Sequence, residues 1–121
     1  RPTWNIAPMP MQIKLKSNNQ VTLFELEGSL DIYTSLDLKA SLEENVKAKG
    51  TTVILDMEKL TYIDSSGIGI VIKALNYVQG LSGKLIVANL KPPIEKVFRV
   101  SGLISYFEIL NGEELKKRYP M

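Results

Sequence analysis

Residues 61–78, TYIDSSGIGIVIKALNYV, contain the most informative pattern for predicting the fold of this protein. An apolar segment ending at Ile63 is followed by Asp64, two serines and a helical pattern, which indicates a strand that turns directly into a helix. Two glycines, Gly67 and Gly69, lie near the start of that helix, although glycine inside a helix costs about 1 kcal/mol relative to alanine. The residues at core spacing are Ile68, Val71, Ile72, Leu75 and Val78.

On the N-terminal side, alternating apolar and polar residues predict strands at residues 11–16 and 21–28. The turn-forming segment SNNQ between them predicts an antiparallel hairpin. A helix is expected over residues 34–50, with Thr34 as its N-cap and Gly50 as its stop. Its apolar stripe consists of Leu38, Leu42 and Val46.

Further elements are predicted on both sides of the opening stretch. The β-branched run at 51–57 and the apolar run at 83–90 are typical of strands covered on both faces. A helix is expected at 91–102, a short strand at 106–110 and a terminal helix at 112–119. This order predicts an α/β fold: a mixed sheet of four to five strands flanked by helices, with an N-terminal antiparallel hairpin followed by alternating helix and strand.

Composition indicates one globular domain, expected over residues 11–121. Residues 1–10, with three prolines and no periodicity, are expected to be a disordered lead-in or an expression remnant. The net charge is only +2 and the lysines are dispersed, so no direct nucleic-acid binding is predicted. No apolar run approaches the length of a membrane span, and the absence of cysteine is consistent with a cytoplasmic protein.

The common catalytic patterns are incomplete. The dinucleotide fingerprint fails because Ile72 stands where its third glycine is needed, and no phosphate-binding loop of the Walker type is present. A nucleophilic Ser65 or Ser66 would lack its usual base, since the sequence contains no histidine, and Lys73 is about two helical turns away. We therefore predict no enzyme, no catalytic residue and no cofactor.

Three aspartates lie at predicted loops or strand ends. Of these, Asp31 and Asp64 are expected to meet at one edge of the sheet. With neither histidine nor cysteine to complete a metal site, capping and turn formation explain these carboxylates, Asp56 above all. No metal site is predicted.

Two explanations compete for the polar, glycine-rich helix start. In the first, Asp64 or Ser65 caps the helix, a contribution of about 1 kcal/mol, and close packing against the sheet accounts for one glycine. In the second, the helix tip is an exposed surface where a partner approaches the bare backbone and a kinase reaches a hydroxyl. The spacing alone leaves both open.

The segment DSSGIG after an apolar strand, with GSLDIYTSLDLKASL at residues 28–42, resembles the STAS domain of bacterial anti-sigma factor antagonists. The resemblance extends from Met11 to Leu110 and includes VFRVSGLISYFEI, which is similar to the third helix and following strand of the family. It implies strands flanked by helices and no catalytic activity. One departure is Ser29, where the family often has glutamate, which leaves the identity of the partner open.

The resemblance also implies a mechanism. Members bind an anti-sigma factor that is also a serine kinase, and so free a sigma factor. The kinase phosphorylates the first serine after the aspartate, which corresponds to Ser65; the phosphoprotein no longer binds, and a PP2C-type phosphatase reverses the change. The expected partner surface comprises Asp31, Asp64, Ser65, Ser66, Gly67, Gly69, Lys73 and Asn76.

A second function remains open for the same fold. It is a STAS scaffold or regulatory subunit of a transport or signalling complex that is never phosphorylated. Such a protein would associate tightly with a fixed partner, and ATP would not affect the association.

Overall fold

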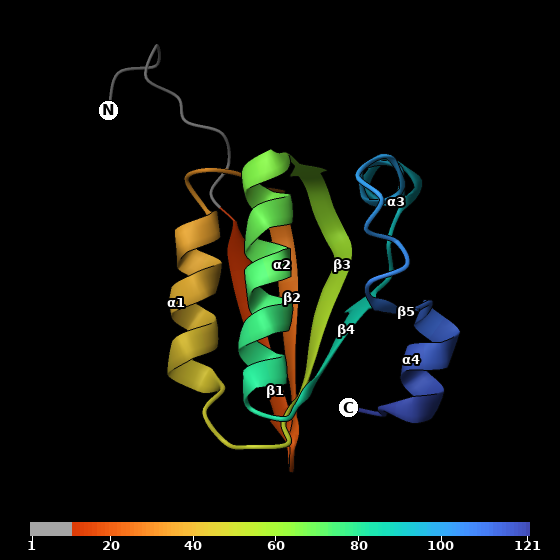
Figure 1. The fold of residues 1–121 in the computed structure, drawn as a ribbon. Helices are drawn as coiled ribbons and strands as arrows, with labels where there is room; N and C mark the ends of the chain where they lie inside the picture. The colour runs from red at the N-terminus through yellow and green to blue at the C-terminus, as the bar shows by residue number, and fades with distance from the viewer. Residues whose placement is uncertain (1–10) are drawn as a thin grey trace.

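The computed structural model describes residues 11–121, so the expected lead-in at residues 1–10 lies outside the described part. Helices and strands alternate after an initial pair of strands, as the sequence predicts (Figure 1). The elements are β1 (Gln12–Asn18), β2 (Val21–Leu30), α1 (Ser35–Asn45), β3 (Thr52–Ile63), α2 (Ser65–Gly80), β4 (Lys84–Ala88), α3 (Pro92–Val100), β5 (Glu108–Leu110) and α4 (Gly112–Arg118).

The strands form one mixed sheet in the order β1-β2-β3-β4-β5. β1 pairs antiparallel with β2, while every later pair of neighbours is parallel. Each parallel connection passes through one helix, because parallel neighbours need a crossover between them. The predicted α/β class, the hairpin and the mixed sheet are confirmed.

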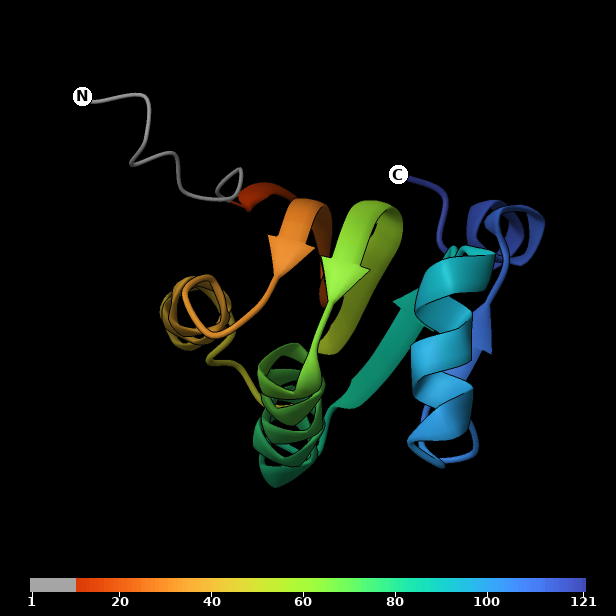
Figure 2. The same cartoon turned by 90° about the horizontal axis from the view of Figure 1, so that it is seen from above.

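The core has two parts, one on each face of the sheet. The larger cluster joins helices α1, α2 and α3 to one face, with Phe24, Val71 and Phe98 fully buried. The smaller cluster lies on the other face, where Leu115 of α4 packs against residues such as Ile54 and Ile86. Figure 2 shows α1 and α2 on one side of the sheet and α4 on the other.

The first helix is shorter than predicted. It ends at Asn45, because Val46 turns into an extended conformation (φ −124°, ψ 99°) and still places its side chain in the core. Gly50, predicted as the helix stop, has φ +79° in the turn that follows. An apolar residue at stripe spacing is therefore buried here without being helical.

The strand predicted at 51–57 and the strand end predicted at Ile63 belong to one continuous strand, β3. Its second half has exposed residues on both sides of Leu60, and its pairing with β2 contains two register irregularities. These irregularities break the two-residue periodicity that defines a strand in sequence. The extension has a consequence for the site, since it brings Ile63 into register with Leu30 at the end of β2.

Candidate functional site

The N-terminus of α2 is capped by Asp64, one of the two residues predicted for that role. Its Oδ1 atom accepts hydrogen bonds from the backbone N–H groups of Ser66, at 2.9 Å, and Gly67, at 3.1 Å. Ser65 is the first residue of the helix and is exposed, whereas Ser66 is half-buried. Because Asp64 supplies the cap, the Ser65 hydroxyl is not needed for it.

The loop after β2 is organised around Asp31, which is only 7% exposed. Its Oδ1 accepts from the backbone N–H of Tyr33, at 2.9 Å, and of Thr34, at 3.1 Å. Thr34 is the N-cap residue of α1, as predicted, but its hydroxyl accepts from the Asp31 N–H and donates to the Ser29 carbonyl and makes no side-chain cap hydrogen bond. Asp31 thus shapes the loop through hydrogen bonds to its own backbone.

The two loops lie side by side at one edge of the sheet, as predicted for Asp31 and Asp64. Leu30 pairs with Ile63, and the Asp64 N–H donates to the Leu30 carbonyl at 3.3 Å. The loop shaped by Asp31 presents Ile32 at this edge, 62% exposed. The ends of β2 and β3 therefore place the exposed Ile32 at the same hollow as Ser66 and Gly69.

The two glycines of α2 have different environments. A Cβ atom on Gly67 would lie 2.3 Å from the Leu30 carbonyl oxygen and 2.7 Å from Cγ1 of Ile63, so only glycine allows the helix to lie this close to the sheet. A Cβ atom on Gly69 would meet nothing within 4 Å. Gly67 is buried and has a packing role, while Gly69 is half-buried and borders open space.

The remaining predicted residues follow α2 away from its tip. Lys73 and Asn76 are both exposed, but only Lys73 lines the hollow beside Ser66 and Gly69. Two exposed apolar side chains at this hollow, Ile32 and Leu36, were not predicted as part of the site. Leu36 could have been noticed, because it lies off the core stripe of its helix.

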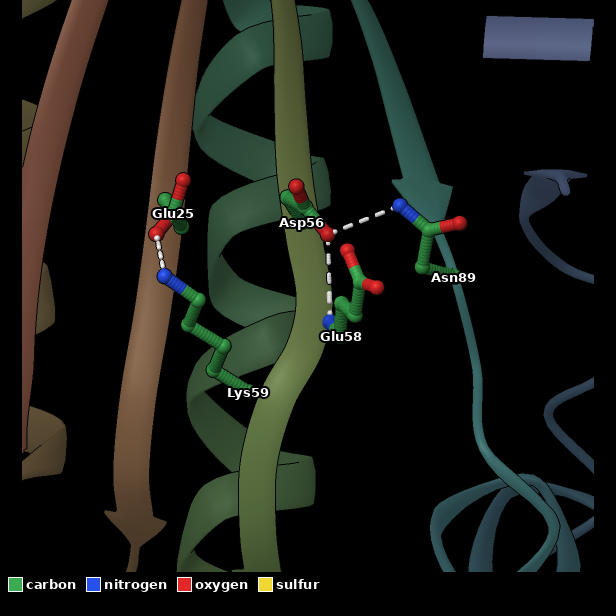
Figure 3. A network of polar contacts seen from close by, with 5 residues as sticks. All are labelled: Glu25, Asp56, Glu58, Lys59 and Asn89. Atoms are coloured by element: carbon green, nitrogen blue, oxygen red, sulfur yellow. Dashed lines mark hydrogen bonds and ion pairs between the residues drawn. The ribbon is translucent and has the colours of Figure 1, made fainter. Parts of the chain in front are cut away.

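The other face of the sheet carries a separate polar network (Figure 3). Oδ1 of Asp56, which is 8% exposed, accepts from the Glu58 N–H at 3.1 Å and from Nδ2 of Asn89 at 3.0 Å. Lys59 forms a salt bridge of 3.0 Å with Glu25. No group of three or more metal-binding side chains occurs within residues 11–121. The network ties β2, β3 and β4 together and is structural.

The salt bridge predicts a pH-dependent contribution to stability. The hydrogen bond from Lys59 lowers the pKa of Glu25 below its ordinary value, and burial opposes that shift. A carboxyl group whose pKa falls on folding stabilises the protein above its unfolded pKa of about 4.3, and the stabilisation is lost as pH falls through the folded pKa. Lys59→Met should therefore destabilise the fold at pH 7 and have little effect at pH 3 in urea unfolding. An equal loss at both pH values would assign the effect to packing.

Comparison with known proteins assigns the family. The chain belongs to the STAS domain family, whose model matches residues 12–115. It is 26% identical over 106 residues to the anti-sigma F factor antagonist of Paenibacillus polymyxa, covering 87% of this chain and 91% of that protein. The resemblance that the sequence indicated is confirmed.

Solved structures give the same result for the fold. The anti-sigma factor antagonist SpoIIAA in its unphosphorylated form superposes with a TM-score of 0.71 at 26% identity, over 88% of this chain and 95% of that chain. The Bacillus protein SpoIIAA in its phosphorylated form gives a TM-score of 0.66 at 26% identity, over 88% and 98% of the two chains. Within residues 11–121, no helix is long and apolar enough to span a membrane.

Proposed function

We propose that this protein is a cytoplasmic anti-sigma factor antagonist that is switched off by phosphorylation of Ser65. In its unphosphorylated form it binds an anti-sigma factor that is also a serine kinase, and a sigma factor is thereby released. A PP2C-type phosphatase restores the binding form. The protein itself acts by binding and catalyses no reaction.

The observation that carries the proposal is the exposed Ser65 at the first position of α2, directly after its capping aspartate. Asp64 already occupies the N–H groups of Ser66 and Gly67, so a modified Ser65 leaves the cap intact. The positive end of the helix dipole also favours a negative charge at this position. Phosphorylation is therefore compatible with the folded state, and we expect it to weaken the complex with the anti-sigma factor without unfolding the domain.

The residues of the proposed partner surface divide into two groups. Asp31 and Gly67 act from inside, one by shaping the loop and the other by allowing close packing. The proposed contacts themselves are made at the exposed or half-buried positions of α2 and its cap, namely Asp64, Ser65, Ser66, Gly69, Lys73 and Asn76.

A phosphorylation assay tests the proposal. The purified chain is incubated with ATP and, one at a time, with each purified anti-sigma factor kinase of the source organism. Intact mass and peptide mapping should then show a single phosphate on Ser65 with one of them. Ser65→Ala should take up no phosphate, whereas the control Ser17→Ala, at an exposed serine of β1 that pairs with Thr22 near the start of β2, should be modified like the wild type. Tight, ATP-insensitive binding of a fixed partner without any phosphate would instead support the scaffold function.

A further inference from the structure

A groove follows the seam between α1 and α2, which lie side by side in both views (Figures 1 and 2). Its first hollow, of about 370 Å³, lies beside Ser66. A second hollow of about 190 Å³ continues it along the helices, and the two share Lys39, Ile70 and Lys73. We refer to both together as the α1–α2 groove.

The first hollow offers an apolar surface that this chain does not cover. Ile32 and Leu36 both line it and are 62% and 67% exposed. Single exposed apolar residues are ordinary, but two that line one hollow form a surface whose burial favours association. Gly69 leaves the hollow open, because no atom lies within 4 Å of the Cβ position. The space fits a large apolar side chain from another molecule.

The charge of the hollow defines the occupant further. Lys39 and Lys73 line it, and none of its lining residues is acidic; Glu43 lines only the second hollow. Neither lysine takes part in a salt bridge within residues 11–121. Carboxylates of a partner are the complementary groups for two such ammonium groups.

We propose that the α1–α2 groove receives a segment of the anti-sigma factor that carries a large apolar side chain and neighbouring carboxylates. This inference rests on the proposed function, since it concerns the same binding event. It also gives a physical reason for the switch. Ser66, the neighbour of Ser65, lines the same hollow, so the segment in the groove would approach the end of α2 that carries Ser65. A phosphate on Ser65 would add negative charge at that end of α2, which is unfavourable for an acidic segment.

Binding measurements with substituted chains test this inference. The probe is the purified anti-sigma factor kinase that phosphorylates Ser65, and the method is titration calorimetry without ATP hydrolysis. Lys39→Glu and Lys73→Glu should each weaken binding at least about tenfold. The matched control Lys96→Glu, an exposed lysine of α3, should change it less than about twofold. Gly69→Leu should also weaken binding at least about tenfold, with an unchanged circular dichroism spectrum and no loss of thermal stability.

The outcomes separate this inference from the function on which it rests. Unchanged or tighter binding by both lysine variants, together with lost binding by Ser65→Asp, would overturn the groove assignment and leave the proposed function standing. Failure of the wild-type chain to bind any anti-sigma factor would overturn both. Dimers of the wild-type chain in sedimentation that Lys73→Glu dissociates would assign the groove to a second copy and also overturn the inference.

Discussion

Ser65→Asp is expected to weaken binding of the anti-sigma factor kinase about a hundredfold. The substitution adds one negative charge at the exposed first position of α2. Against an acidic group about 5 Å away, at an effective dielectric constant near 20, the repulsion is about 3 kcal/mol. That energy corresponds to about two powers of ten in the dissociation constant. Titration calorimetry at low salt measures the loss directly.

The same variant should keep its fold. An aspartate in the first turn of a helix interacts favourably with the helix dipole, typically by about 0.3–1 kcal/mol. Ser65→Asn is the matched control, because it is similar in size and shape to aspartate but carries no charge, and it should bind within a few fold of the wild type. Tight binding by Ser65→Asp would contradict the switch, and lost binding by both variants would assign the effect to shape.

Gly67→Ala is expected to destabilise the protein by about 1–2 kcal/mol. The added methyl group would lie 2.3 Å from the Leu30 carbonyl oxygen, so either α2 or the end of β2 must move. Overpacking of this kind costs about 1–3 kcal/mol and occasionally more, and the gain in helix propensity offsets only about 1 kcal/mol. The Leu30 carbonyl also accepts the Asp64 N–H, so a shift would disturb the cap residue.

Gly69→Ala, two residues further along α2, is the control for this prediction. It adds the same methyl group where no atom lies within 4 Å, and should therefore raise stability by up to about 1 kcal/mol. Urea unfolding of the two variants under identical conditions should give midpoints on opposite sides of the wild type. Midpoints shifted in the same direction would contradict the view that Gly67 is required for close packing while Gly69 faces open space.

Much of the fold could be predicted from local pattern, because the hairpin and the buried strands follow from alternation and β-branched runs. The full length of β3 could not, since its irregular pairing with β2 breaks the period after Asp56. Val46 shows a related limit: its spacing fits the helical stripe, but its backbone is extended. In both cases, contacts between elements in the folded protein determine the backbone conformation, and the local residue pattern does not predict it.

The site shows the same division. The sequence predicted a helix capped by Asp64 or Ser65, but only the hydrogen bonds of Asp64 in the folded protein show that the Ser65 hydroxyl is not needed for the cap. The different roles of Gly67 and Gly69 were not predictable, because they depend on where the Leu30 carbonyl lies after folding. The burial of Asp31 likewise depends on hydrogen bonds within its loop, which the sequence alone does not reveal.

Asp64 caps α2, while the neighbouring Ser65 is the proposed phosphate acceptor. Two residues therefore serve the two roles that a single capping serine would otherwise combine. Since the Ser65 side chain is not required for the cap, the proposed phosphorylation and dephosphorylation of Ser65 could be repeated without any change in the fold. In the proposed cycle, the fraction of active molecules is then set by the ratio of two enzymatic rates and not by a conformational equilibrium of this chain. Moderate changes in the stability of the domain would alter the lifetime of the folded protein. The fraction of phosphorylated molecules would depend only on the rates of the kinase and the phosphatase.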